Sequence, residues 1–502
     1  MSSESSTGLL RLRAIVPFTA MMFVVSLARP VAAYVPDNRW SFTASGSTGA
    51  SGTPATLTWS FAPDGTSIPG EGASNLISYF DGLFNVTSGG SDLTQRPWFT
   101  YFKQSFDRWT ALGGITFTYE SHDTGSSLQS SSGSLGVRGD VRIGGALIDG
   151  PSGTLAYTWL PNSGDMVVDT GETTFYSNSS NNYRRLRNTI MHELGHAFGL
   201  NHIESSTDAI LMEPIINLGI DGPQLDDVRG IQGMYGDAFE KSNGGLGNGT
   251  AARATSLGSL AVGGTLAVGS DAIGGQAVSP TETDFVSIAN TGDVDFFSFT
   301  VGASTRLDAT LTPLGGIFSQ GIEGGVQSSF DANARNDLAL SIFASNGATL
   351  LGTANLAGVG GVESLSNISL AAAGKYFARI SGADDNLQLY QLQLSAAALV
   401  TALAGDYNQD GVVNAADYSI WRNSLGSVGS NLAADGNGNG QVDAADYSVW
   451  KSNFGMLAGS GSGSLAGSGS VPEPACLVLL AIAALLSPLV RARQAIRGTR
   501  PR

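Results

Sequence analysis

Residues 192–202 of the chain read HELGHAFGLNH. His192 and His196 stand four residues apart, so on a helix they lie on one face and can bind the same metal ion. Gly199 allows the chain to leave that helix in a left-handed turn, which brings His202 round as a third ligand. Three imidazoles leave the fourth position of a tetrahedral zinc ion open to water, as in catalytic sites. The stretch therefore predicts one catalytic Zn²⁺.

Glu193 follows the first of these histidines, where its carboxylate can reach a zinc-bound water and act as general base. A bare HExxH pattern also occurs on ordinary surface helices, but the extended form HExxHxxGxxH is typical of catalytic zinc sites. The chain has four histidines, and three of them fall in this one stretch. We therefore predict that Glu193 is catalytic and that His122 is an ordinary surface or loop residue.

The composition restricts the other chemistries. The net charge is −16, which argues against nucleic acid as a partner because phosphate binding needs clustered Lys and Arg. The acidic balance indicates either cation binding or solubility, and the sequence leaves both open. The single cysteine, Cys476, lies near the C-terminus, so we expect neither disulfides nor a thiolate metal site in the body of the chain.

The N-terminal residues 1–33 have the layout of a signal peptide. Arg11 and Arg13 form a basic region, an apolar stretch runs from Ala14 to Ala28, and Val31-Ala32-Ala33 fits a cleavage site of small residues. The sequence therefore predicts an exported protein.

The C-terminal residues have the layout of a second targeting signal. A Gly/Ser-rich linker at 457–470 is followed at 471–502 by Pro472-Glu473-Pro474, an apolar run and several arginines. This segment resembles a PEP-CTERM sorting signal, which implies transient membrane anchoring through the apolar helix, processing by a sorting peptidase, and an extracellular or cell-envelope location. A plain C-terminal membrane anchor remains the alternative.

Residues 34–238 mix strand and helix patterns. Alternating or apolar runs at 57–61, 115–119 and 141–143 predict strands, and helical periodicity predicts helices at 98–112, 182–198 and 225–235. We expect an α+β domain.

This region resembles the matrixins, a family of metzincin peptidases, through the zinc motif, Leu211-Met212-Glu213-Pro214 and residues 224–236. The resemblance implies a twisted mixed sheet with an active-site helix, a protein or peptide substrate, and a Met-turn in which Met212 packs beneath the metal. Where the family carries histidines for a second, structural zinc, this chain has Tyr157 and Val167, so we expect one zinc ion. No cysteine precedes the domain, so the family's cysteine-switch latency cannot operate.

Residues 149–156 and 164–172 are similar to the structural calcium loops of the matrixins. Oxygen ligands suit Ca²⁺, although a solvated acidic turn would have the same composition. By the similarity, one or more calcium ions would bind the side chains of Asp149, Asp169 and Glu172 and the backbone carbonyls of Gly150, Ser152 and Thr154.

A linker at 239–250 leads into residues 251–400, which show short alternating strands typical of an all-β sandwich. The segments 293–299 and 374–376 resemble the bacterial pre-peptidase C-terminal domain. No catalytic constellation stands out here, so we predict an accessory role.

Residues 401–456 contain two repeats, at 406–417 and 435–446, that fit a twelve-residue calcium loop with Gly at the sixth position. Amphipathic segments at 418–425 and 447–454 follow them. The repeats resemble a type I dockerin, a small α domain with an EF-hand-like pair, which implies a cohesin partner; a calcium-stabilised spacer is the alternative. We expect two calcium ions, one at Asp406, Asn408, Asp410, Val412, Asn414 and Asp417, and one at Asp435, Asn437, Asn439, Gln441, Asp443 and Asp446.

Two functions follow from these patterns. The first is a secreted or envelope-associated zinc endopeptidase. The second is a non-catalytic, calcium-stabilised envelope or adhesion protein with a degenerate protease fold. The intact Glu193 favours the enzyme, since a dead domain has no need of it. The sequence leaves open the substrate, which depends on how residues 214–222 fold, and whether residues 34–55 act as a propeptide.

Overall fold

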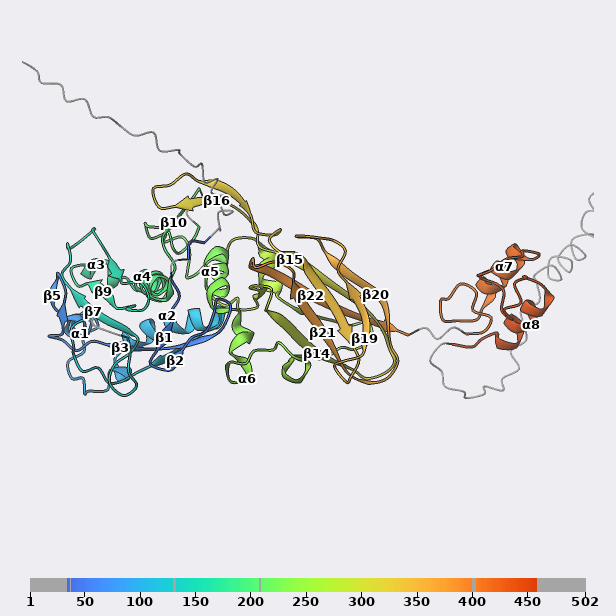
Figure 1. The fold of residues 1–502 in the computed structure, drawn as a ribbon, viewed down its shortest axis with the longest axis horizontal. Helices are drawn as coiled ribbons and strands as arrows, with labels where there is room; N and C mark the ends of the chain where they lie inside the picture. Colours follow the sequence, from blue (N-terminus) through green and yellow to red (C-terminus); the bar gives the residue numbers. More distant parts are fainter. Residues whose placement is uncertain (1–33, 37, 130–131, 207–208, 400–402, 458–502) are drawn as a thin grey trace, which may run out of the picture. The chain divides into compact units, whose positions relative to one another are not determined.

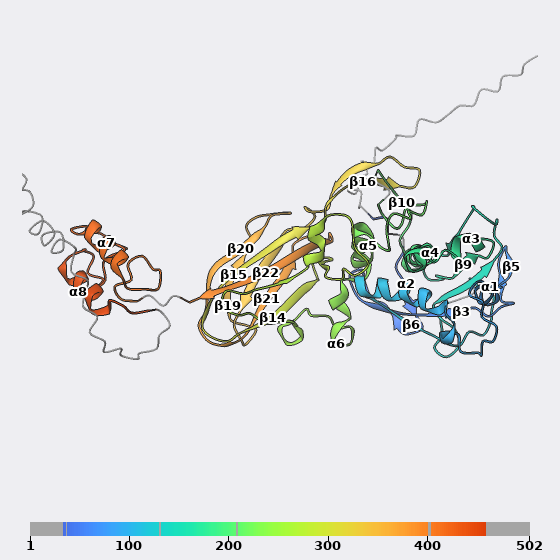
Figure 2. The ribbon, with the colours of Figure 1, turned by 180° about the vertical axis from the view of Figure 1, so that it is seen from behind.

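The computed structural model describes residues 34–36, 38–129, 132–206, 209–399 and 403–457 (Figures 1 and 2). The chain divides into two compact units, and the division falls after Leu399. The expected signal peptide and sorting tail lie outside the described residues. Within the described ranges, no helix is long and apolar enough to cross a membrane.

The first unit begins with a mixed sheet in the order β6-β3-β7-β9-β8. Neighbours in it run parallel except β8, which pairs antiparallel with β9 at one edge. A mixed-sheet region was expected and is confirmed. The strands are β3 (Ala55–Phe61), β6 (Ile115–Tyr119), β7 (Val141–Ala146), β8 (Ala156–Thr158) and β9 (Met166–Asp169), and small hairpins are formed by β1 (Phe42–Thr43) with β2 (Gly46–Ser47) and by β4 (Ser67–Ile68) with β5 (Gly72–Ala73).

Helices α2 and α4 share one aromatic core with the sheet. The helical spacing of Phe99, Phe102, Phe106 and Trp109 buries one face of α2, and Phe106 stacks on Trp59 of β3 with ring centroids 4.1 Å apart. The helices of this region are α1 (Leu76–Leu83), α2 (Phe99–Leu112), α3 (Thr173–Tyr176), α4 (Ser180–Phe198) and α5 (Leu225–Tyr235), with a short 3-10 turn at Leu93–Gln95.

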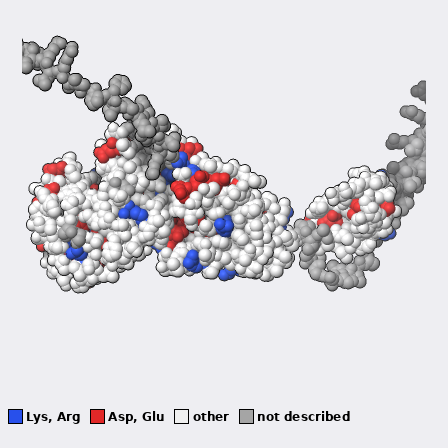
Figure 3. Space-filling view, in the orientation of Figure 1, with Lys and Arg blue, Asp and Glu red and all other residues white. Residues whose placement is uncertain are grey.

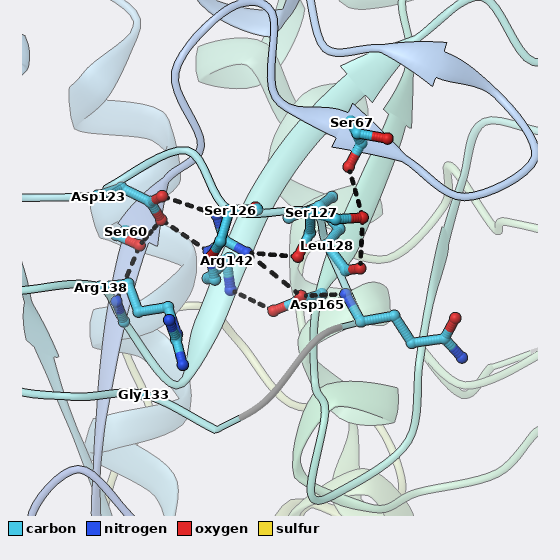
Figure 4. A network of polar contacts seen from close by, with 12 residues as sticks. Ser60, Ser67, Asp123, Ser126, Ser127, Leu128, Gly133, Arg138, Arg142 and Asp165 are labelled. Carbon is cyan, nitrogen blue, oxygen red and sulfur yellow. Dashed lines mark hydrogen bonds and ion pairs between the residues drawn. The ribbon is translucent and has the colours of Figure 1, made fainter.

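Arg142 of β7 is fully buried and lies at the centre of a polar network (Figure 4). Its guanidinium donates to both carboxylate oxygens of Asp123, at 2.7 and 2.8 Å, and to the carbonyl oxygen of Ser126 at 2.8 Å. Asp165 accepts the backbone N–H of Arg142 at 3.2 Å, and its burial raises its pKa to about 7. The network ties the loop that follows β6 to the sheet.

Residues 34–55 pack on the side of α4 and α5. Trp40 is fully buried and donates from Nε1 to the carbonyl oxygen of Ala197 at 2.7 Å, and the backbone N–H of Gly52 donates to the carbonyl oxygen of Met234 at 3.0 Å. The described part of this segment is therefore packed against the fold through Trp40 and Gly52.

A β-sandwich follows in the same unit. One sheet has the order β11-β14-β21-β18-β19 and the other the order β12-β22-β15-β20, with β13 also paired to β22. Strict alternation of buried and partly buried residues along β15 gives this strand one core face. The strands are β11 (Thr255–Ser259), β12 (Thr265–Val268), β13 (Val286–Ile288), β14 (Val294–Val301), β15 (Thr305–Leu314), β18 (Leu338–Phe343), β19 (Leu350–Ala354), β20 (Glu363–Leu370), β21 (Gly374–Gly382) and β22 (Gln388–Ala398).

The sandwich and the mixed-sheet region are joined in two ways. They share an apolar cluster in which Leu225 and Val228 of α5 pack with Phe285, Phe318 and other residues of the sandwich. In addition, a hairpin of β16 (Ile317–Ile322) and β17 (Ser328–Asp331), here called the docking hairpin, pairs through β16 with β10 (Ile203–Ser205) (Figure 1). The segment between the two regions contains the short turns Ala238–Lys241, Ser242–Gly245 and Ala251–Arg253.

The second unit contains α7 (Ala415–Ser424) and α8 (Ala444–Asn453), each following one repeat loop. The tryptophan of each repeat helix forms a hydrogen bond with the loop of the other repeat. Trp421 donates from Nε1 to the carbonyl oxygen of Asp443, and Trp450 donates to that of Asn414, both at 2.8 Å. The sequence duplication is therefore repeated in the contacts.

Lysine and arginine residues are scattered in small groups over the face shown in Figure 3. The described residues on that face form no large continuous basic patch of the kind that binds a phosphate backbone.

Candidate metal centre

The imidazoles of His192, His196 and His202 converge on one point. Nε2 of His202 lies 3.2 Å from Nε2 of His192 and 3.0 Å from Nε2 of His196. Two nitrogens that each bind a tetrahedral zinc ion at about 2.0–2.1 Å lie about 3.3 Å apart, so the spacing fits zinc. Helix α4 supplies the first two rings, and its C-cap Gly199, with φ of 117°, turns the chain back towards the third.

Each ring is held by its other nitrogen. His192 donates from Nδ1 to the carbonyl oxygen of Leu211 at 2.8 Å, and His196 donates to that of Leu200 at 2.7 Å. Burial lowers the pKa of His192 to about 4 and the pKa of His196 well below its ordinary value. Both rings are therefore neutral at pH 7 with a free lone pair on Nε2, which is the form that binds zinc.

Glu193 lies beside this triad with its carboxylate in the same cleft. Burial raises its pKa to about 7, and the hydroxyl of Thr158, which donates to Oε2 at 2.8 Å, partly offsets that rise. A carboxylate whose pKa lies near neutrality is suited to both accepting and returning a proton.

Met212 is buried against helix α4. A Cβ atom built on Gly195 would lie 2.2 Å from its sulfur, so a larger residue at this position would force the buried Met212 side chain to move. Asp227 anchors the chain at Leu211 and Met212. Its carboxylate accepts their backbone N–H groups, at 2.8 Å and 3.2 Å respectively. Asp227 thereby fixes the carbonyl of Leu211 that orients His192.

An open cleft of about 750 Å³ contains the triad and Glu193. Residues 153–158, which include the edge strand β8, form part of its lining, as do Pro214, Ile215 and Ile216. No lining residue comes from the described part of residues 34–55. An adjoining cavity of about 520 Å³ shares Pro214–Ile216 and includes Gln327 of the docking hairpin.

The structure brings together part of the predicted calcium site in this region. Asp169 accepts the backbone N–H of Gly150 at 3.0 Å, and Glu172 accepts those of Ser152 and, at 3.3 Å, Gly153. The carboxylate of Asp149 instead caps its own loop by accepting the N–H of Thr154 at 2.9 Å. Tyr157 and Val167 lie in an apolar cluster with Leu128.

The two repeat loops have the same internal bonding. Asp406 accepts the N–H of Gly411 at 2.9 Å, and Asp435 accepts that of Gly440 at 2.7 Å. The last carboxylate of each loop closes it: Asp417 accepts the N–H of Asn414, and Asp446 accepts that of Asp443, both at 2.8 Å. The predicted ligand residues of each repeat therefore lie in one folded loop.

Among the described residues, histidine and carboxylate ligand atoms gather within 4.8 Å at two places. One is the triad. The other is a cluster of Glu240, Asp293 and Asp295 where the two regions of the first unit meet. Burial raises the pKa of Glu240 to about 8 and that of Asp293 to about 7.

Three residues of the centre were missed from the sequence: Thr158, Asp227 and Glu323. Thr158 belongs to no motif. Asp227 was included in a helix resemblance without a role. Glu323 lies in a region predicted to be accessory, yet its carboxylate accepts from Nδ1 of His202 at 2.8 Å. His122 is exposed, and its side chain lies beside Glu120.

The chain matches three family models. Residues 83–236 match the matrixins, residues 293–382 the bacterial pre-peptidase C-terminal domain, and residues 404–454 the dockerin type I domain. These matches confirm the three resemblances inferred from the sequence.

Similar curated proteins are metalloendoproteinases. The chain is 32% identical over 143 residues to Metalloendoproteinase 2-MMP of Arabidopsis thaliana, covering 27% of this chain and 36% of that protein. It is 28% identical over 181 residues to Metalloendoproteinase 1-MMP of the same plant, covering 34% and 48%. It is 31% identical over 159 residues to the interstitial collagenase of Bos taurus, covering 30% and 31%. The chain thus spans between about a third and a half of the length of these relatives.

Proposed function

Since the chain contains a matrixin domain, a bacterial pre-peptidase C-terminal domain and a type I dockerin domain, we propose that it is an exported zinc endopeptidase that hydrolyses peptide bonds in proteins. The observation that carries this proposal is the convergence of three imidazoles in an open cleft with a buried carboxylate beside them. Zinc bound there supplies Lewis-acid chemistry, which acidifies water and polarises a carbonyl group.

The substrate lies along the edge strand β8. Among the described strands, β8 pairs only with β9, so its other edge offers backbone N–H and C=O groups to an extended peptide. Pro214, Ile215 and Ile216 add apolar surface to the same cleft. Main-chain pairing gives affinity for any extended segment, and these side chains discriminate between its residues.

Glu193 is the general base. It accepts a proton from the attacking water, the water oxygen bonds to the scissile carbonyl carbon, and Glu193 passes the proton to the leaving amine as the peptide bond breaks. Thr158 holds the carboxylate in the cleft through its hydroxyl. General acid–base catalysis of this kind contributes about 10²–10⁴-fold to the rate.

Calcium stabilises the protein at two kinds of site. We place structural calcium at the 149–154 loop with Asp169 and Glu172, and one ion in each repeat loop. The dockerin domain implies a cohesin partner. The N-terminal segment 1–33 directs export. A sorting peptidase then cleaves within residues 471–502 and releases the protein from the membrane.

The test uses the purified full chain with zinc and calcium and follows cleavage of an unstructured protein. We expect activity that is lost in Glu193→Ala and after chelation, while Glu193→Ala still binds zinc. Asp107→Asn is a matched control, because Asp107 is an exposed carboxylate on α2 whose pairing with Lys103 contributes little. Stoichiometric zinc without cleavage of any of several proteins would instead support the non-catalytic envelope protein.

A further inference from the structure

The three zinc-binding rings differ in what holds their second nitrogen. The acceptors for His192 and His196 are the backbone carbonyls of Leu211 and Leu200, which lie within the matrixin match. The acceptor for His202 is a side chain 121 residues further along, the carboxylate of Glu323, with Nδ1 and Oε2 2.8 Å apart. Glu323 lies in the turn of the docking hairpin, which belongs to the β-sandwich region.

Strand pairing puts Glu323 at this position. Strand β10 begins directly after His202, and Ile203 pairs with Ile322 of β16 in antiparallel register. Continuing that register by one residue sets His202 opposite Glu323, and residues so placed have Cβ atoms about 5 Å apart. The contact therefore follows from a backbone ladder, although the Glu323 side chain is 57% exposed.

The docking hairpin is anchored to the matrixin domain beyond this ladder. Gln320 donates from Nε2 to the buried carboxylate of Asp226 on α5 at 2.7 Å. Phe318 and Phe330 are buried in the shared apolar cluster, and the guanidinium of Arg229 lies 5.2 Å from the ring centroid of Phe330. These contacts hold β16 in register against β10.

We propose that Glu323 is a positioning residue of the zinc centre, so that the pre-peptidase C-terminal domain completes a site whose ligands all belong to the matrixin domain. The proposal rests on the zinc site of the proposed function. The carboxylate accepts the Nδ1 proton of His202, which fixes the tautomer with its Nε2 lone pair facing the metal. A carboxylate behind a ligating imidazole also raises the basicity of that ligand.

The competing explanation is an exposed ion pair between Glu323 and a protonated His202, which would contribute little to any property of the protein. The two explanations differ in their effect on metal binding. Removing a hydrogen-bonding partner behind a metal ligand typically costs 10–100-fold in metal affinity, whereas losing an incidental surface pair leaves the affinity unchanged.

The experiment measures the zinc dissociation constant of the full chain by competition with a chromophoric chelator and records the absorption spectrum of the cobalt-substituted protein. For Glu323→Ala we expect about 10–100-fold weaker zinc binding and an altered cobalt spectrum. Val326→Ala, in the same exposed turn, is the matched control and should match the wild type in both. The urea midpoints of the metal-free proteins report whether the hairpin stays docked.

Two conservative variants separate position from charge. Glu323→Gln keeps an acceptor oxygen at the same reach without the charge, and Glu323→Asp keeps the charge one methylene short of the imidazole. We expect Glu323→Gln to bind zinc more tightly than Glu323→Asp. The reverse order, or Glu323→Ala binding zinc within twofold of the wild type with an unchanged cobalt spectrum, would overturn the proposal.

These readouts do not depend on proteolysis. If the wild type binds zinc and cleaves nothing, the proposed function fails, and the variants still decide the role of Glu323. If the wild type binds no zinc, both proposals fail.

Discussion

Thr158 and Glu193 lie 35 residues apart in the sequence, yet their side chains meet in the cleft. The short edge strand β8 carries Thr158 over helix α4, and a hydroxyl there can donate to a carboxylate that is otherwise buried. The Glu193 carboxylate, the proposed general base, is therefore held by a residue with no motif of its own.

Replacing Thr158 by Val keeps the shape of the side chain and removes the donor. We expect kcat/KM to fall about tenfold, since a hydrogen bond to a charged group contributes about 1.5–3 kcal/mol and neighbouring water replaces part of it. Steady-state kinetics on a peptide substrate measure the change. Thr158→Ser, which keeps the hydroxyl, should retain most of the activity, and equal losses in both variants would contradict this role.

The substitution Gly195→Ala tests how closely Met212 packs against α4. Alanine normally stabilises the interior of a helix relative to glycine by about 0.5–1 kcal/mol. Here the added Cβ would lie 2.2 Å from the buried sulfur, so we expect Gly195→Ala to destabilise the metal-free protein by about 1–3 kcal/mol, the usual cost of overpacking. Urea denaturation measures this, and Gly195→Ala should cost less when Met212→Ala has already cleared the space.

The predicted ends of the helices lie within a few residues of the observed ends. The helix predicted at 225–235 is α5, and the one predicted at 98–112 is α2, which begins one residue later. The expected helix at 182–198 is assigned from Ser180, but residues 181–183 have positive φ, so its regular turns begin at Arg184.

The repeat helices begin earlier than expected. The segments predicted at 418–425 and 447–454 are helical from Ala415 and Ala444. Asn414 and Asp443 cap the two helices, and the twelfth loop residue, Asp417 or Asp446, completes each capping box. The last residue of each calcium loop thus also lies in the first turn of a helix.

The first residue of each loop gives a matched pair of tests. Asp406 and Asp435 each accept two backbone N–H groups of their own loop, and both offer position-one carboxylates to calcium. We expect Asp406→Ala and Asp435→Ala each to lower the number of bound calcium ions by one, and the double variant to lower it by two. Titration calorimetry of the full chain measures this, and unchanged stoichiometry in both single variants would contradict the assignment.

At the scale of the whole molecule, the matrixin domain and the β-sandwich behave as one compact unit. Their shared apolar cluster and the docking hairpin bury residues of both. The carboxylates of Glu240, Asp293 and Asp295 lie at the same junction, and Asp237 is buried nearby with its pKa raised to about 6.

This junction makes stability depend on pH. The unfolded carboxylates have pKa values near 4, while burial raises those of Glu240 to about 8 and Asp293 to about 7 in the folded state. Between pH 6.5 and 8.5 these two carboxyl groups therefore hold more protons in the folded state than in the unfolded state, so their contribution to the free energy of unfolding falls as pH rises. Asp165 and Asp227, each with a pKa of about 7, act in the same direction.

Urea denaturation at pH 6.5 and pH 8.5, with a chelator present throughout, measures the effect. Glu240→Gln removes one of the titrating groups and should reduce the dependence on pH. A free energy of unfolding that stays constant or rises over this range would contradict the assignment of these groups.

Features that depend on short spacing could be predicted from the amino-acid sequence. The interval of four residues between His192 and His196, the glycine that ends their helix, and the duplicated twelve-residue loops each act through backbone geometry within one or two turns of chain. The same local patterns were enough to identify three domain types, which the family matches confirm.

The groups that come to the centre from distant parts of the chain are seen in the folded protein and not in the sequence. Thr158 reaches Glu193, Asp227 holds the turn at Met212, and Glu323 meets His202 from another domain. Each contact arises because separate elements pack or pair in a particular register, and such contacts leave no periodic pattern in the sequence. Strand pairing between β10 and β16 depends on the docking of two whole domains. The sequence could therefore predict that His192, His196 and His202 lie together, but not that Glu323 contacts the third of these rings.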